Sequence, residues 1–327
     1  MIVAVDAAGG DFYPKNPVEG ALQAIKENSD LTVLLVGPED LIKKELADHS
    51  YDEKRVLIHD APQVIGMEES PAQAVKTKQQ SSIVVGIGLH KAGKCDAFVS
   101  AGNTGALLAA SMFILGKLKG VLRPTIASYY PTLKGFRLLV DAGANLDIKP
   151  ETALQFSKMA EIYCEQILKI DSPKVGLLNV GEEEGKGTEI LKEIYNTLKQ
   201  EDNFIGNVEG KDILSGKADV YICDGLVGNI VLKFGESIPD ILQKMIGSAV
   251  QDMNLSEKEI QNIQKVLHTA LSPFNYENVG GIPFLGVNGV SIVGHGGSSP
   301  LAIKNMIKSA VKTVENDVNG KIVASLN

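Results

Sequence analysis

The stretch 97–118, AFVSAGNTGALLAASMFILGKL, combines the three features that decide the fold of this chain. It begins with a short apolar run typical of a buried strand, continues through a glycine-containing loop (101–105), and ends in an apolar helix. Similar units recur along the 327 residues. Alternation of this kind predicts a three-layer α/β/α fold, in which a mostly parallel, Rossmann-like sheet carries helices on both faces.

The same patterns set the order of the predicted elements. Strands are expected at 2–5, 31–36, 56–58, 97–100, 126–129, 138–140, 175–179, 204–208, 220–223 and 290–293. Helices are expected at 17–27, 39–47, 105–118, 151–168, 188–199 and 300–318. No proline- or serine-rich linker and no block of like charge divides the chain, so we expect one α/β domain over residues 1–327.

Region 237–272 departs from this alternation, because two amphipathic helical patterns follow each other with no strand between them. Ser237 is expected to cap the first helix, with Pro239 in its first turn. Ser256 and Glu259 have the spacing of a capping box for the second. We therefore expect a helix hairpin inserted as a protrusion, whose apolar faces contact the domain, a twin subunit, another partner or a membrane.

Composition excludes several classes of function. The 32 Lys and Arg residues are outnumbered by 40 Asp and Glu, and the net charge of −8 rules against broad nucleic-acid binding. Only three residues are arginine, so a bound anion should be held by backbone N–H groups and lysines. The three cysteines form no disulfide framework, and the longest uncharged stretch is too short to span a bilayer. We expect a cytoplasmic protein with at most peripheral membrane contact.

Motifs that mark common cofactor sites are missing from the sequence. No G-x-G-x-x-G opens a helix, no G-x-S-x-G occurs, and the five histidines lack metal-ligand spacing. The segment 88–95, GLHKAGKC, nearly matches a phosphate-binding P-loop, but it ends in cysteine and precedes a strand. We expect no metal, no cofactor and no nucleotide hydrolysis.

Six loops that follow predicted strands carry glycines and small polar residues. In an open α/β sheet, ligands bind at the carboxyl ends of the strands, and helix N-termini there attract anions. This arrangement predicts an enzyme that binds and positions phosphate, without naming a reaction. The candidate site residues are Asp6, Gly9, Gly10, Asp11, Gly102, Asn103, Thr104, Gly105, Asn145, Gly185, Lys186, Asp224, Gly228, Asn229, His295 and Ser298.

Several segments together resemble the phosphate acyltransferase family of bacterial phospholipid synthesis, the PlsX family. They are VSAGNTGAL (99–107), VDAGAN (140–145), LLNVGEEEGKGTE (177–189), FIGNVEGKDI (204–213), CDGLVGNIVLK (223–233), VGGIPFLGVNG (279–289) and GHGGSS (294–299). The resemblance is collinear over nearly the whole chain. It implies a fold similar to phosphate acetyltransferases and the isopropylmalate dehydrogenase group.

The resemblance also implies a function. The family is cytoplasmic and dimeric, and it converts acyl-[acyl carrier protein] and orthophosphate into acyl phosphate and free carrier protein. A membrane glycerol 3-phosphate acyltransferase then uses the acyl phosphate. Other functions considered are a phosphate acetyl- or butyryltransferase acting on acyl-CoA, a dehydrogenase, and a non-catalytic scaffold for lipid enzymes.

Attack of phosphate on a thioester needs positioning and positive charge more than acid–base catalysis. On that logic, Lys186 is expected to hold the phosphate or the developing oxyanion, and residues 103–105 to cradle phosphate. Asn229 would donate to the carbonyl oxygen, with Asp224 orienting it. His295 is expected to be either an acid or electrostatic aid or a hydrogen-bonded loop residue. Asp6 and Asp11 are expected to fix loop geometry rather than to bind the pantetheine amides.

The acidic carrier protein implies a docking surface rich in lysine. Two groups of basic residues are candidates: Lys117, Lys119 and Arg123 after one helix, and Lys304, Lys308 and Lys312 at four-residue spacing on the last helix. A solvated helix face is the simpler explanation of the second group.

Overall fold

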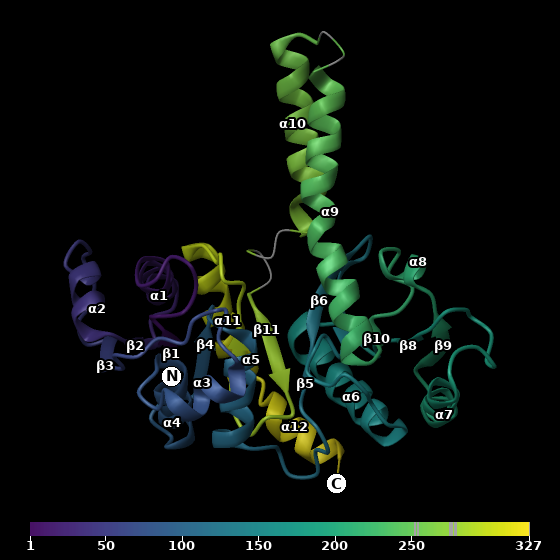
Figure 1. Cartoon of the computed structure of the whole chain (residues 1–327), viewed down its shortest axis with the longest axis horizontal. Helices are drawn as coiled ribbons and strands as arrows, with labels where there is room; N and C mark the ends of the chain where they lie inside the picture. The colour runs from purple at the N-terminus through teal and green to yellow at the C-terminus, as the bar shows by residue number, and fades with distance from the viewer. Residues whose placement is uncertain (252, 254, 275–276, 278–279, 327) are drawn as a thin grey trace.

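The computed structural model describes residues 1–251, 253, 255–274, 277 and 280–326. Its strands form two sheets that lie side by side, with a helix hairpin projecting between them (Figure 1). Both sheets are mostly parallel and carry helices on both faces, so the predicted α/β fold class is confirmed.

The first sheet has seven strands in the order β3-β2-β1-β4-β12-β11-β5. Five of them are parallel: β1 (Ile2–Asp6), β2 (Thr32–Gly37), β3 (Val56–Asp60), β4 (Ala97–Ser100) and β12 (Val290–Val293). Two short strands, β11 (Ile282–Leu285) and β5 (Thr125–Ile126), are antiparallel to their neighbours at one edge. Chain order reverses between β1 and β4, which places a topological switch point there.

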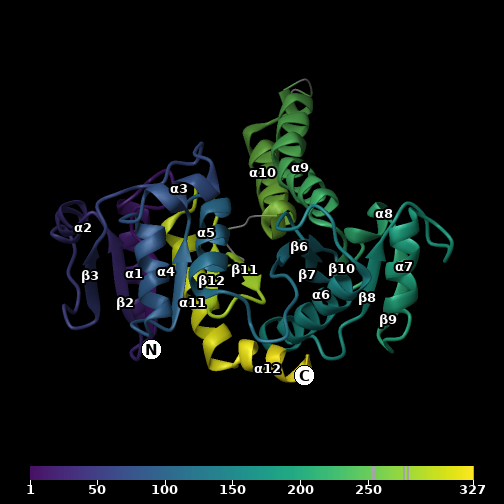
Figure 2. The same ribbon diagram turned by 60° about the horizontal axis from the view of Figure 1, so that its bottom comes forward.

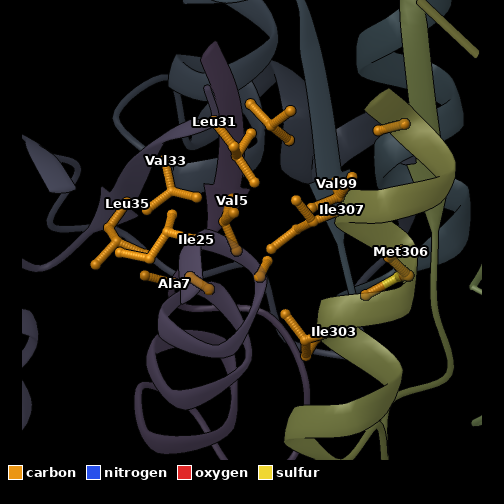
Figure 3. Close-up of a cluster of buried hydrophobic side chains, with 14 of the residues drawn as sticks. Val5, Ala7, Ile25, Leu31, Val33, Leu35, Val99, Ile303, Met306 and Ile307 are labelled. Carbon is orange, nitrogen blue, oxygen red and sulfur yellow. The ribbon is translucent and has the colours of Figure 1, made fainter. Parts of the chain in front are cut away.

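Period-two alternation of side chains builds the two core layers of this sheet. Val5 faces α1 (Lys15–Glu27) and α11 (Pro300–Glu315), as Figure 3 shows, together with side chains such as Val33 and Ile307. Helix α2 (Glu39–Leu46) covers the same side. The opposite face packs on α3 (Pro71–Thr77), α4 (Ser82–Lys91) and α5 (Thr104–Ala110), which η1 (Ser111–Leu115) extends.

The second sheet has five strands in the order β6-β7-β10-β8-β9. They are β6 (Ser128–Thr132), β7 (Gly135–Val140), β10 (Val220–Ile222), β8 (Val175–Leu178) and β9 (Phe204–Val208), and only β6 is antiparallel to its neighbour. One face packs on α6 (Pro150–Tyr163) with its extension η2 (Cys164–Leu168), on α7 (Glu189–Leu198) and on α12 (Val318–Ser325). The other face packs on α8 (Gly210–Ile213) and on the start of α9 (Gly225–Gln251).

The two sheets share a hydrophobic core. Leu285 of β11 and Ile322 of α12 belong to the cluster that covers the second sheet. In the same buried layer, the hydroxyl groups of Tyr129 on β6 and Tyr163 on α6 are hydrogen-bonded to each other at 2.7 Å. The chain also crosses between the sheets more than once. One α/β domain over residues 1–327 stays a prediction.

The hairpin differs from its prediction at its start. Helix α9 runs without a break from Gly225 to Gln251, and Pro239 lies inside it. Ser237 therefore caps nothing, and its hydroxyl donates to the Phe234 carbonyl at 2.7 Å. The predicted cap is wrong because the turn after Cys223 already begins a helix that reaches the proline.

The second hairpin helix, α10 (Glu257–Leu271), begins as predicted, with a capping box between Ser256 and Glu259. No residue of α10 is buried, and α10 and the outer part of α9 project away from the sheets in a second view (Figure 2). A short turn, η3 (Ser272–Phe274), follows α10. Among the described helices, none is both long and apolar enough to cross a membrane.

Candidate active site

Three loops of the first sheet converge at its switch point: those after β1, β4 and β12. A side chain added at Gly9 would lie 2.9 Å from the backbone nitrogen of Gly102, so the first two loops touch through backbone alone. A side chain at Gly10, where φ is +89°, would meet the Gly296 carbonyl oxygen at 2.8 Å. The backbone N–H of Asp11 donates to that same carbonyl at 2.8 Å.

Asp6 fixes two of these loops from inside. Its buried carboxylate accepts hydrogen bonds from the Ser100 hydroxyl at 2.5 Å and from the Ala8 N–H at 3.1 Å. Ser100 in turn accepts from the Gly102 N–H at 3.0 Å. Burial raises the pKa of the Asp6 carboxyl above its ordinary value. These contacts are those of a residue that holds loop geometry.

Asn103 uses its side chain in the same structural way. Its Oδ1 accepts from the Ala106 N–H at 2.9 Å, which caps α5, and its Nδ2 donates to the carbonyls of Gly66 and Met67 at 3.1 Å each. The neighbouring Gly105 lies against Pro71, where a side chain would approach to 2.5 Å. The adjacent Thr104, by contrast, is exposed.

On the second sheet, the loop after β7 holds the start of α9. Asn145 is fixed by Asp141, whose carboxylate accepts from the Asn145 backbone at 2.6 Å and from its side-chain amide at 2.8 Å. The Asn145 carbonyl accepts the Gly225 N–H at 2.6 Å. A side chain at Gly228 would lie 1.8 Å from the Asp141 carbonyl oxygen, so only glycine permits this close packing.

Asp224 holds the first turn of α9 and thereby places Asn229. Its carboxylate accepts the Val227 N–H at 2.8 Å. Asn229 follows one turn later, is exposed, and lies beside Gly143 of the β7 loop. Asp224 thus orients the helix that carries Asn229.

A cavity of about 290 Å³ lies where the two sheets meet. It brings together four of the predicted site residues from separate elements: Thr104, Asn229, His295 and Ser298. Other polar groups in its lining are Ser128, Lys233 and Glu236. Its apolar wall includes Ile126, Tyr129, Tyr130, Phe136, Leu232, Ile282, Val293 and Met306.

His295 and Ser298 share the loop after β12. The Ser298 hydroxyl donates to the His295 carbonyl at 2.6 Å, and His295 Nδ1 accepts the Gly297 N–H at 3.1 Å. His295 is exposed, while Ser298 is buried at the cavity wall. The predicted choice between an electrostatic aid and a hydrogen-bonded loop histidine stays open, since both fit this placement.

Lys186 and Gly185 lie on the loop after β8 and are not among the described residues that line the cavity. The Lys186 side chain is half-exposed, with Nζ 3.8 Å from the Glu183 carboxylate on the same loop. Its carbonyl accepts from Asn179 Nδ2 at 3.1 Å. The catalytic role of Lys186 stays a prediction.

The lysines suggested for carrier-protein docking are partly engaged within the chain. Lys304 and Lys308 both pair with Glu27, and their hydrogen bonds lower the pKa of that carboxyl to about 2. Lys117 Nζ donates to the Leu122 carbonyl at 2.8 Å.

Sequence reasoning missed part of the cavity lining. Lys233 and Glu236 follow Asn229 by four and seven residues, so a helix continued from Gly225 would have placed all three on one face. Because the first hairpin helix was expected to start at Ser237, this shared face could not be recognised from the sequence. Tyr130 and Phe136 lie on strands β6 and β7, and nothing in their sequence pattern marks them as cavity residues.

Solved structures of α/β transacylases share this fold. A phosphotransacetylase from Streptococcus pyogenes aligns with a TM-score of 0.62 over 96% of this chain and 94% of its own, at 14% identity. The EutD phosphotransacetylase from Staphylococcus aureus aligns with a TM-score of 0.60 over the same shares, also at 14% identity. At such identities the likeness shows the fold, and it places the chain in a structural class that includes phosphotransacetylases.

The family follows from sequence comparison. A family model described as "Fatty acid synthesis protein" matches residues 1–321. A curated phosphate acyltransferase from Chlorobaculum parvum is 50% identical over 338 residues, which cover 100% of this chain and 99% of the relative. A phosphate acyltransferase from Salinibacter ruber is 49% identical over 94% of this chain and 92% of its own. The chain belongs to this family, the PlsX phosphate acyltransferases, and is an acyltransferase.

Proposed function

We propose that this acyltransferase moves a fatty acyl group from acyl carrier protein to orthophosphate and so supplies acyl phosphate for phospholipid synthesis. The observation that carries the proposal is the cavity between the sheets, whose lining includes both polar groups and many apolar side chains. Thr104, Asn229 and Ser298 supply hydrogen-bonding groups, whereas Ile126 and Phe136 offer only apolar surface. A substrate with a reactive carbonyl at one end and a hydrocarbon chain at the other fits both parts.

The proposed reaction is a direct transfer. One oxygen of HPO₄²⁻ attacks the thioester carbonyl carbon, a C–O bond forms, and the C–S bond breaks with its electron pair on sulfur. The phosphate proton passes to that sulfur, so the products are acyl phosphate and the free thiol of the carrier. Near neutral pH a substantial share of orthophosphate is the dianion, and this form needs little help from a general base to attack.

The residues around the cavity suit this chemistry. The Asn229 amide can donate to the carbonyl oxygen as negative charge develops there. Such stabilisation is usually the largest single contribution to the rate of acyl transfer. The apolar wall stabilises a long chain by about 0.8 kcal/mol for each buried methylene group. The large apolar share of the lining supports a fatty acyl donor over an acetyl donor.

The testing experiment measures loss of thioester with two donors. Acyl carrier proteins loaded with chains of different length are compared with the matching acyl-CoA esters, with and without orthophosphate. The proposal expects phosphate-dependent turnover that is faster with carrier-bound long chains. Preference for short acyl-CoA would instead indicate a phosphate acetyl- or butyryltransferase, and absence of any turnover would favour a non-catalytic role.

A homodimer is part of the proposal. The hairpin carries exposed apolar side chains, including Ile241, Met245 and Val266, that nothing in a single chain covers among the described residues. Its tip, 251–259, is rich in charged and polar residues, which favours a second copy over insertion into lipid. Sedimentation analysis should give twice the chain mass, and replacing Ile241 and Met245 by Glu should give the monomer.

The acyl phosphate product would pass to a membrane glycerol 3-phosphate acyltransferase.

A further inference from the structure

The cavity contains a lysine that the proposed reaction has not yet used. Among the described residues that line the cavity, Lys233 is the only lysine or arginine. Phosphate carries two negative charges to this place, and a further charge develops on the thioester oxygen as the bond forms. A cation within the site, added to hydrogen-bond donors, offsets this charge.

The position of Lys233 is set by the helix that carries it. Asn229, Lys233 and Glu236 all line the cavity, and their spacing of four and three residues puts them on one face of α9. The base of α9 is fixed by the Gly225 contact with Asn145 and by the tight approach of Gly228 to Asp141. Lys233 therefore stands one helical turn beyond Asn229, at about 6 Å along the axis.

The present partner of Lys233 is a weak one. Its Nζ lies 2.8 Å from the Glu236 carboxylate, and the two side chains are 60% and 40% exposed. Exposed pairs of this kind contribute little, because solvent screens both charges. A phosphate dianion entering the cavity would offer Nζ twice the charge of that carboxylate, so exchange of partners costs little.

We propose that Lys233 binds the attacking phosphate dianion, with Glu236 holding its ammonium group in the cavity until phosphate arrives. The inference rests on the proposed function, because it assigns a residue to the phosphate of that reaction. It leaves Lys186 the other predicted role, charge stabilisation at the developing oxyanion.

The variants Lys233→Gln and Lys233→Arg test this assignment. The first removes the charge, and the second keeps it. Lys244→Gln is the matched control, since Lys244 is an exposed lysine farther along the same helix and does not line the cavity. Inorganic phosphate alone is the probe, and the melting temperature and KM for phosphate are the readouts.

Phosphate should raise the melting temperature of the wild type and of Lys244→Gln, because a ligand that binds only the folded state stabilises it. Lys233→Gln should lose this shift, and its KM for phosphate should rise by about 10- to 100-fold, the range that a hydrogen bond to a charged group provides. The KM for the acyl donor should stay unchanged. Lys233→Arg should recover most of the phosphate affinity.

Two outcomes would overturn the assignment: a wild-type protein that phosphate does not stabilise, or a Lys233→Gln variant that responds to phosphate as the wild type does. Either can be seen without any acyl donor. Failure of this inference is therefore separate from failure of the proposed function, which would appear as absent phosphate-dependent turnover in the wild type.

Discussion

At the residue scale, burial separates the polar groups that hold loops from those that face the cavity. The side chains of Asp6 and Asn103 are hydrogen-bonded to neighbouring backbone. Thr104 and Asn229, by contrast, are exposed and line the cavity. Substitutions in the first pair should lower stability and activity together. Substitutions in the second pair should lower activity with the fold intact.

Lys186→Ala should abolish formation of acyl phosphate and leave the folded protein unchanged. The side chain is half-exposed and pairs only loosely with Glu183, so its removal costs little stability. Turnover is measured with long-chain acyl carrier protein, and circular dichroism checks the fold. Lys192→Ala, which removes a partly exposed lysine that pairs with Glu189 three residues away, is the control. Near-normal turnover of Lys186→Ala would remove Lys186 from the mechanism.

His90 predicts a pH dependence of stability. Its Nδ1 lies 3.0 Å from the Cys95 carbonyl and its Nε2 accepts the Val290 N–H at 2.9 Å, which fixes the neutral ring. Burial lowers the pKa of His90 below its ordinary value. Below about pH 6.5 the unfolded chain binds a proton that the native ring resists, so the native state loses stability as pH falls, by at most ~1.4 kcal/mol per unit.

Urea unfolding at pH 7.5 and 5.5 checks this for the wild type and His90→Gln. The glutamine variant is less stable at pH 7.5 because it loses the fixed ring, but its stability should change less between the two pH values. An equal change in both proteins would show that His90 does not titrate as its burial indicates.

At the element scale, the sequence pattern located most strands and helices, but it did not predict that α9 is one unbroken helix. The β-branched runs predicted β4, β9 and β12 with their observed bounds, because buried parallel strands are nearly continuous apolar runs. It missed β11, whose strand includes Pro283 between glycines at 281 and 286. It placed the start of the first hairpin helix at Ser237, whereas α9 already begins at Gly225, because Pro239 suits the first turn of a helix capped by Ser237. That error also concealed Lys233, since the face shared with Asn229 exists only on an unbroken helix.

Pro239→Ala should strengthen α9 at the point where the hairpin leaves the body. Proline cannot donate to the Gly235 carbonyl four residues earlier, and its cost inside a helix is ~3 kcal/mol. Hydrogen exchange of amides around residues 235–243 should therefore slow in the variant. Gln243→Ala on the same helix adds no hydrogen bond and should leave exchange nearly unchanged. Faster exchange in Pro239→Ala would mean that the proline stabilises α9.

At the scale of the whole molecule, the site exists because two sheets share one core. Thr104 and His295 come from the first sheet, and Asn229 from a helix that starts beside the second. The sequence pattern predicted the loops of each sheet. It did not predict that the loops of the two sheets face one cavity, because the contacts of β11 and α12 with the second sheet join residues far apart in the chain. The residues of the cavity wall could not be predicted for the same reason, since they come from elements far apart in the chain.

The shared core predicts that both sheets unfold together. Hydrogen exchange at increasing urea should show β1 of the first sheet and β8 of the second losing protection at the same concentration, since Leu285 and Ile322 join the two layers. Replacing Ile322 by Ala removes one of these shared contacts and should shift both sheets equally. Separate transitions for β1 and β8 would show that the chain folds as two domains.

Direct transfer of the acyl group to phosphate can be followed by isotope tracing. The enzyme is incubated with long-chain acyl carrier protein and oxygen-18 phosphate, and mass spectrometry follows both the product and the protein. We expect acyl phosphate that retains all four labelled oxygens, and no acyl group on the enzyme when phosphate is left out. An acylated enzyme formed without phosphate, or thioester loss that yields no labelled acyl phosphate, would contradict it.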